Sequence, residues 1–118
     1  MSAQSVDQAF FEKVVRTVEE RIGDADFSVQ ELADAMAMST SQITRKLRAL
    51  ISHSPGQLIR SIRLQRAADL LAANAGNVAE IGYQVGFNDQ SHFSRTFKRH
   101  YGKTPVDYRR EAGRRPGA

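Results

Sequence analysis

The chain contains an internal repeat, and this repeat limits its fold more than any other feature of the sequence. A shift of 49 residues superposes the segment 29–33 on the segment 78–82, and a shift of 50 residues superposes Arg45 and its neighbours on Arg95 and its neighbours. The agreement covers apolar positions, small residues, polar caps and one arginine, so chance is a poor explanation. The 118 residues therefore divide between two copies of one small unit.

Each copy of the repeat has the pattern of a short helix, a turn of three or four residues, and a longer helix. Capping signatures begin these helices, as in Ser28–Glu31 and Ser39–Gln42, where a hydroxyl is followed three residues later by Glu or Gln. Ala33 and Gly82 are small where the two helices of a unit must approach closely. No segment of any length has the pattern of a strand. The predicted class is all-α with about seven helices, as two homeodomain-like helix-turn-helix units over about 28–52 and 77–101.

A linker helix over about 55–73 is predicted between the two units. Ser54 is a good N-cap, and Pro55 suits the first helical position. Two apolar sides run along this helix, which predicts packing from two directions. One side consists of Leu58, Ile59, Ile62 and Leu70, and the other of Leu64, Ala67, Ala68 and Leu71. A first helix over 7–22 and a last one from Thr104-Pro105 to about Glu111 complete a domain over 7–111. Residues 1–6 and 112–118 are expected to be a disordered leader and tail.

Composition excludes several classes of protein. Cysteine is absent, so disulfides and thiolate metal sites are excluded and a reducing, cytoplasmic compartment is expected. No apolar run approaches the roughly 20 residues that cross a bilayer, so no membrane contact is expected. Residues 1–27 hold six acids and three bases (net −3), whereas residues 28–118 hold seven acids and fourteen bases (net +7). This uneven charge indicates a polyanionic partner for the body of the chain, or else a well-solvated surface.

The second helix of each unit has an outward face without acidic residues. Opposite its apolar residues lie hydroxyl, amide and cationic groups, which match the hydrogen-bonding edges of bases in the major groove of double-stranded DNA. The predicted base-contacting residues are Ser41, Gln42, Thr44, Arg45, Gln90, Ser91, Ser94 and Arg95. The residues predicted to lie near phosphates are Ser39, Lys46, Arg48, Asn88, Lys98, Arg99 and Lys103. Arg63 and Arg66, on the linker helix, are candidates for salt bridges only. That helix would be roughly 28 Å long, close to the ~34 Å between successive major grooves.

Two other classes of function compete with DNA binding. An enzyme is disfavoured because the histidines, His53, His92 and His100, do not combine with acids or hydroxyls at a spacing that forms a catalytic or metal site, and no glycine-rich phosphate loop follows a strand. Neither a cofactor nor a metal is expected. A helical protein–protein interaction module whose basic face meets an acidic partner remains the alternative.

Four segments in the second half of the chain together form a distinctive pattern: Ile81–Phe87, Phe93–Arg99, Gly102–Pro105 and Tyr108-Arg109. This pattern resembles the DNA-binding domain of the AraC/XylS family of bacterial transcription regulators, and the resemblance extends over about residues 8–110. It implies two helix-turn-helix units that bind promoter DNA, with Ser41, Thr44, Arg45, Gln90, Ser91, Ser94 and Arg95 facing the bases. One departure is Ser41, where family members often carry a larger residue.

The resemblance also bears on what surrounds this domain. The family's sensing module is absent, and the segment before Phe27 is similar to the one preceding this domain in two-component response regulators and hybrid sensors. An output domain of a larger regulator is therefore expected, with a free-standing short activator as the alternative. RNA polymerase is a candidate partner, and dimerisation of the parent protein stays open.

Overall fold

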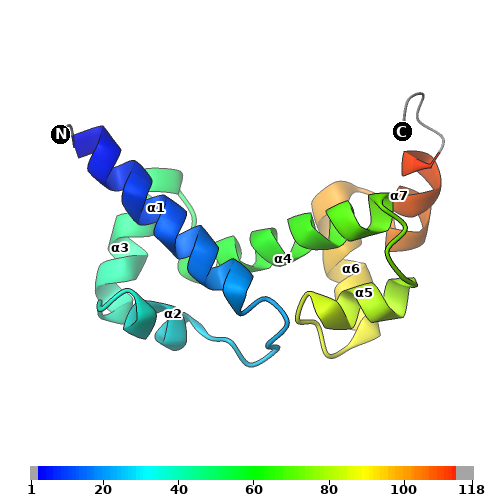
Figure 1. The fold of residues 1–118 in the computed structure, drawn as a ribbon, viewed down its shortest axis with the longest axis horizontal. Helices are drawn as coiled ribbons and strands as arrows, with labels where there is room; N and C mark the ends of the chain where they lie inside the picture. Colours follow the sequence, from blue (N-terminus) through cyan, green and yellow to red (C-terminus); the bar gives the residue numbers. More distant parts are fainter. Residues whose placement is uncertain (1–2, 114–118) are drawn as a thin grey trace. The chain divides into compact units, whose positions relative to one another are not determined.

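Seven helices make up the part of the chain that the computed structural model describes, residues 3–113 (Figure 1). In chain order they are α1 (Ala3–Glu20), α2 (Val29–Ala35), α3 (Thr40–Ile51), α4 (Pro55–Ala72), α5 (Val78–Gln84), α6 (Gln90–Tyr101) and α7 (Pro105–Ala112). No strand occurs among these residues, which confirms the all-α prediction. None of the seven helices has both the length and the apolar character needed to span a membrane.

The helix ends confirm the repeat. The bounds of α2 and α5 differ by 49 residues, and those of α3 and α6 differ by 50. The one extra residue lies in the turn, which spans residues 36–39 in the first copy and 85–89 in the second. The backbone of the turn also repeats, since Ala37 and Gly86, each directly after the C-cap of its helix, adopt positive φ angles of 55° and 95°.

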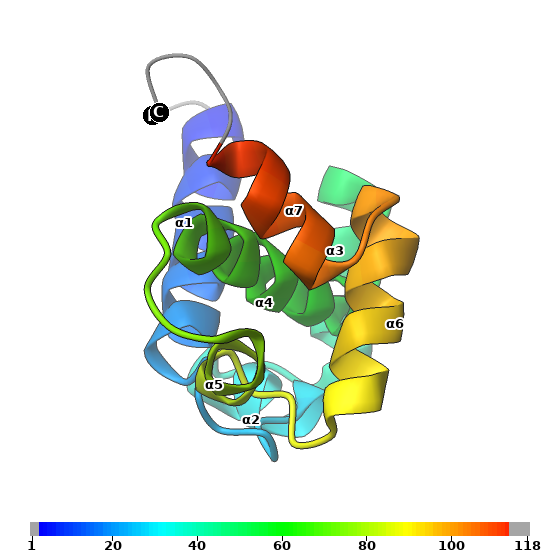
Figure 2. The same ribbon diagram turned by 90° about the vertical axis from the view of Figure 1, so that its right-hand side faces the viewer.

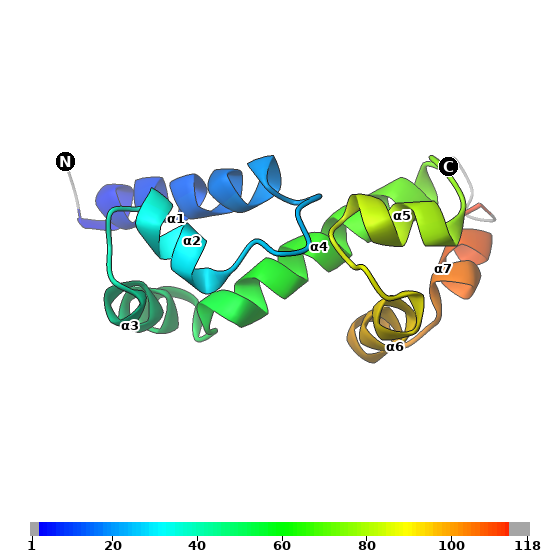
Figure 3. The ribbon, with the colours of Figure 1, turned by 90° about the horizontal axis from the view of Figure 1, so that it is seen from below.

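The helices separate into two compact units. Unit 1 comprises the chain up to Ile22 and Asp26–Ile62, and unit 2 comprises Gly23–Ala25 and the chain from Arg63 onward. In unit 1, α2 contacts both α1 and α3 (Figure 3). In unit 2, α5, α6 and α7 are arranged around the C-terminal part of α4 (Figure 2).

Each unit has its own apolar interior. In unit 1, Val14 and Val18 of α1 pack with Leu32, Ile43 and Leu47, all of them at most 1% exposed. In unit 2 the interior combines aliphatic residues of α4 and α5 with a cluster of aromatic rings. The ring centroids of Phe87 and Phe93 lie 5.2 Å apart, those of Phe93 and Phe97 5.9 Å, and those of Phe97 and Tyr108 5.4 Å. Such tilted and edge-on ring pairs stabilise the unit beyond the burial of their area.

Three expectations need correction. α1 begins at Ala3, so residues 3–6 are helical rather than part of a disordered leader, because no glycine or proline interrupts the helix there. At the other end, α7 includes Ala112, which is 6% exposed; residues 1–2 and 114–118 of the predicted leader and tail lie outside the described residues. The two apolar sides predicted for α4 belong to different units, and Leu70 is the exception; unit 1 contains Leu58, Ile59 and Ile62, and unit 2 contains Leu64, Ala67, Ala68 and Leu71. Leu58 and Ile59 join the unit 1 core, while Leu70, predicted to share their side, belongs to unit 2.

Gly82 provides a first stability test. A Cβ built at Gly82 would lie 2.8 Å from Cδ2 of Phe93 and 3.0 Å from Nε2 of Gln90, so the close approach inferred from the sequence is real. Gly82→Ala should destabilise the protein by about 1–3 kcal/mol in urea unfolding, although alanine is the better helix former.

Unit 1 supplies the control for this test, because it has Ala33 and Ile43 at the equivalent positions. Adding Phe93→Ile to Gly82→Ala recreates that combination, so the double variant should lose less stability than the sum of the two single losses. A loss in the double variant equal to the sum of the two single losses would contradict the close approach of Gly82 to Phe93.

The caps that end α3 and α6 provide a second test. Ser52 and Gly102 have φ angles of 59° and 79°, and their N–H groups donate to Arg48 O and Lys98 O. A Cβ at Gly102 would meet no atom within 4 Å, so Gly102→Ala isolates the cost of a left-handed backbone. We expect a loss of about 1 kcal/mol for Gly102→Ala and a gain of about 0.5 kcal/mol for Ser52→Gly, by thermal unfolding. Changes of the same sign would refute this account.

Candidate nucleic-acid interface

The outward side of α3 gathers four of the predicted base- and phosphate-contacting residues. Ile43 and Leu47 are fully buried on the inner side of α3. At 100° per residue, the outer side lies about 100–200° from Ile43. It carries Ser41, Thr44, Arg45 and Arg48, of which Thr44 is half-buried and the other three are exposed. No acidic residue occurs anywhere in α3.

The outward side of α6 repeats this arrangement. Phe93 and Phe97 are fully buried, and the opposite side carries Ser91, Ser94, Arg95 and Lys98, with Arg99 at its edge. Ser94 is half-buried, while the other four side chains are exposed. Like α3, α6 contains no acidic residue. Each unit thus places hydroxyl and cationic groups together on one solvent-facing helix side.

The two predicted glutamines occupy different positions in their helices. Gln42, at the third position of α3, completes a capping box in which its Oε1 accepts from Ser39 N at 2.8 Å. Gln90, at the first position of α6, is half-buried and donates to Ala79 O of α5 at 3.0 Å. The difference follows from the 50-residue register, which aligns Gln42 with His92 and Gln90 with Thr40. Gln90 therefore joins α5 to α6.

Three predicted phosphate-contacting residues are engaged within the protein. Nζ of Lys46 lies 4.3 Å from the centre of the Phe10 ring of α1, a cation–π contact. Lys103 forms an ion pair with Glu111 of α7. Ser39 is the N-cap of α3, and its hydroxyl accepts from Gln42 N at 3.1 Å. Asn88 is exposed and directly precedes Asp89, the N-cap of α6.

The N-cap of α6 is Asp89, which puts a carboxylate at the start of this helix. Its Oδ1 accepts from His92 N at 2.9 Å. This hydrogen bond is the main reason that the pKa of Asp89 lies below its ordinary value; smaller lowering effects come from Ser91 N and from the charges of Arg95 and His92. The equivalent cap of α3 is the neutral Ser39. The two units thus differ in charge at the helix end that enters DNA in helix-turn-helix proteins.

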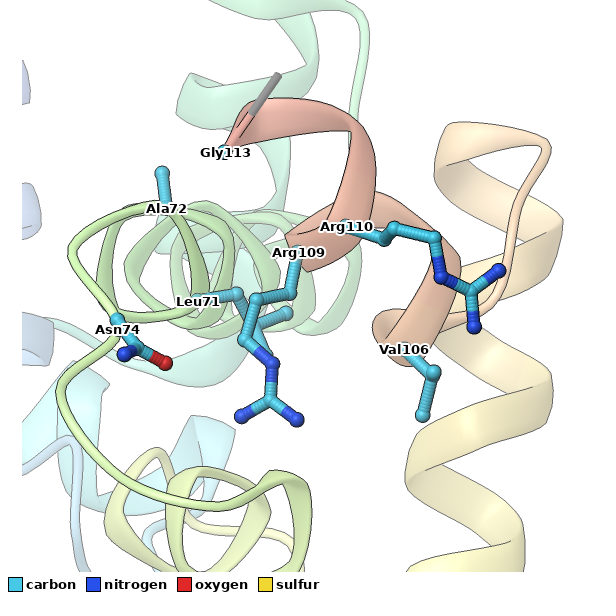
Figure 4. A pocket seen from close by; sticks show the side chains of 7 residues that line it. All are labelled: Leu71, Ala72, Asn74, Val106, Arg109, Arg110 and Gly113. Carbon is cyan, nitrogen blue, oxygen red and sulfur yellow. The ribbon is translucent and has the colours of Figure 1, made fainter. Parts of the chain in front are cut away.

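A shallow groove of about 490 Å³ lies between the end of α4 and α7 of unit 2 (Figure 4). Leu71 and Val106 form apolar parts of its lining, and Arg109 and Arg110 contribute its charge. Nη1 of Arg109 donates to Gly76 O at 3.1 Å, and Nη1 of Arg110 donates to Asp107 at 3.1 Å. Both arginines therefore have partners within unit 2. Over residues 3–113, no three His, Asp or Glu side chains are grouped so that they could hold a metal ion.

The fold and the two cationic helix faces define a helix-turn-helix protein of the DNA-binding class. A model of the helix-turn-helix domain family matches residues 32–111, well over half of the chain. The chain belongs to the AraC-type helix-turn-helix family, whose members are DNA-binding transcription regulators.

Solved structures support this assignment. An AraC-type transcriptional regulator from Chromobacterium violaceum is similar with a TM-score of 0.85 and 26% identity, covering 96% of this chain and 99% of that one. The DNA-binding domain of AdpA, solved in complex with a target DNA, is similar with a TM-score of 0.81 and 29% identity, covering 91% and 96%.

The curated relatives of this chain are much longer proteins. Histidine kinase P4 of Formosa agariphila is 32% identical over 108 residues, which is 92% of this chain and 8% of that protein. Several others, 33–34% identical, are named as transcriptional regulators or activators. The chain spans less than a third of the length of these relatives.

The Asp89 cap provides the third test. Because the pKa of Asp89 is lowered by folding, its ionised form contributes stability above the ordinary value of 3.8, and this contribution is lost as the pH falls through the lower folded value. Asp89→Asn keeps a capping oxygen but cannot titrate. In urea unfolding followed down to about pH 2, the free energy of unfolding should therefore fall less steeply with acid for Asp89→Asn than for the wild type.

The equivalent cap of α3 gives the inverse control. Ser39→Asp should add an acid-sensitive contribution that the wild-type cap lacks. If the free energy of unfolding falls with acid equally in the wild type and both variants, then ionisation of Asp89 does not distinguish the two caps.

Proposed function

We propose that this chain reads double-stranded DNA sequence-specifically by inserting α3 and α6 into successive major grooves. The observation that carries the proposal is the duplicated, acid-free helix side, with Arg45 and Arg95 at equivalent exposed positions. The solved AdpA domain bound to a target DNA supports it by similarity. DNA as the ligand also implies action at the bacterial nucleoid in the cytoplasm, by binding rather than by catalysis.

The side chains divide into two proposed roles. Arginine can donate both of its terminal N–H groups to O6 and N7 of guanine, so Arg45 and Arg95 are the proposed readers of base identity. The exposed hydroxyls Ser41 and Ser91, with Thr44 and Ser94 beside them, would donate to or accept from neighbouring base edges. Gln42 and Gln90 are weaker candidates, because each already bonds a backbone group. Arg48, Lys98 and Arg99 are the proposed phosphate contacts, since they are exposed.

We further propose that this chain is the output module of a larger, signal-responsive regulator. Its match to a small fraction of a histidine kinase and its similarity to the C-terminal domain of AraT, a response regulator from Geobacillus stearothermophilus, support this role. RNA polymerase would then be a partner during activation, and the parent protein is a candidate dimer.

Selection of bound duplexes from a random pool, followed by titration at several salt concentrations, tests the DNA-reading proposal. A consensus site and a steep fall of affinity with salt are expected. Binding without sequence preference or salt dependence would favour the alternative, a basic helical module for acidic protein partners.

Substitutions on α6 provide the fourth test, by separating base reading from phosphate contact. On the selected duplex, Arg95→Ala should cost about 1–3 kcal/mol and relax selectivity at one base pair. Arg45→Ala should do the same at a different base pair. Lys98→Ala is the control, because loss of a phosphate contact weakens binding to all sequences and lowers the salt slope by about 1. Equal losses for Arg95→Ala on specific and random duplexes would show that Arg95 contacts only phosphate.

A further inference from the structure

Arg63 of α4 is a buried cation that donates hydrogen bonds to two backbone carbonyl groups. Its side chain is 7% exposed; Nη1 donates to Val85 O at 2.9 Å, and Nη2 donates to Asp24 O at 3.0 Å. Burying a guanidinium without partners would be costly, so these charge-assisted bonds hold their acceptors firmly. Burial lowers the pKa of Arg63 and the Asp24 carboxylate opposes this shift, yet arginine remains charged at neutral pH.

The acceptor Asp24 O belongs to a short loop with an unusual place in the chain. Gly23–Ala25 group with unit 2, although the residues on both sides of this loop, Ile22 and Asp26, group with unit 1. A Cβ built at Gly23 would lie 3.4 Å from Gln84 O at the end of α5, an ordinary contact distance, so the loop backbone lies next to α5. The chain therefore passes between the units after Ile22, after Ala25 and after Ile62, rather than only once along α4.

The bonds of Arg63 to this loop matter for a protein that binds DNA through two units. When two binding modules are joined, binding of the second module increases the overall affinity. The size of this increase depends on how well the connection restricts the position of the second module. A single helix can bend or twist at its centre, whereas a second chain connection opposes such movement. This reasoning rests on the proposed function, in which both α3 and α6 contact one duplex.

We propose that Arg63 is a positioning residue for DNA binding. By holding the loop 23–25 in unit 2, it supplies a connection between the units in addition to α4, and it thereby sets which spacing of half-sites the protein accepts. Arg63 itself need not contact DNA.

The fifth prediction concerns the protein without DNA. Because the sequence has no cysteine, Ser41→Cys and Ser91→Cys place two spin labels at defined exposed sites, one in each unit. Adding Arg63→Met removes the donors from the buried site but keeps an unbranched side chain, and should broaden the distribution of label-to-label distances. Arg60→Met is the matched control on the same helix, where the arginine is exposed, and should leave the distribution unchanged. An unbroadened distribution in Arg63→Met would overturn the proposal.

Binding to spaced half-sites gives a readout that a purely structural role would not move. Inserting about five base pairs between half-sites turns the second to the opposite side of the duplex, and should weaken wild-type binding about 100-fold. In Arg63→Met this penalty should fall to about 10-fold or less, while affinity for a duplex with one half-site stays unchanged. An unchanged penalty would refute the positioning role.

The two readouts separate this proposal from the proposed function. Absence of sequence-specific binding by the wild type would refute two-helix DNA reading, whereas the spin-label result stands without DNA. If Arg63→Met does not fold, Arg63→Lys replaces it in both experiments. A lysine keeps the charge but cannot span both carbonyls with a planar fork, so the same broadening and the same reduced penalty are expected.

Discussion

The close contact between the two helices of each hairpin is the interaction on which both units depend. In unit 2 it requires glycine at position 82, because a Cβ there would meet the Phe93 ring at 2.8 Å. In unit 1, Ala33 fits because the facing residue of the repeat is Ile43. The two copies thus keep one backbone arrangement with different side-chain volumes. This pairing matters for function, since it fixes which side of α3 and α6 is buried and which side remains in solvent.

The exposed sides of α3 and α6 are similar but not equivalent. Both present an arginine and hydroxyls without acids, as the sequence indicated. They differ at the helix start, where α3 has the neutral Ser39 with Gln42 and α6 has the carboxylate of Asp89. A negative charge there disfavours a nearby phosphate, whereas the hydroxyl does not. The two proposed reading helices therefore approach DNA with different electrostatic preferences at their N-terminal ends.

Several side chains that sequence reasoning assigned to DNA serve the protein itself. Gln90 lies about 60° from Phe93 around α6, on the side facing α5, and so it reaches Ala79 O. Lys46 lies on the flank of α3 next to α1, where it meets Phe10. Lys103, in the turn between α6 and α7, forms an ion pair with Glu111 of α7. In each case the helical periodicity or the residue type was read correctly, but the neighbouring element that would supply a partner was not known.

The sequence by itself determined the helices, their caps and the repeat, because these depend on residues close together in the chain. The capping signatures at Ser28 and Ser39, the 49- and 50-residue shifts and the buried side of each hairpin were all readable in this way. Tertiary structure alone decided the partners of Arg63, since backbone carbonyl groups leave no mark in a sequence. It also assigned the loop 23–25 to unit 2 and placed Leu70 there, away from the other residues of its predicted side. These features arise from contacts between segments up to 39 residues apart, which local patterns cannot specify.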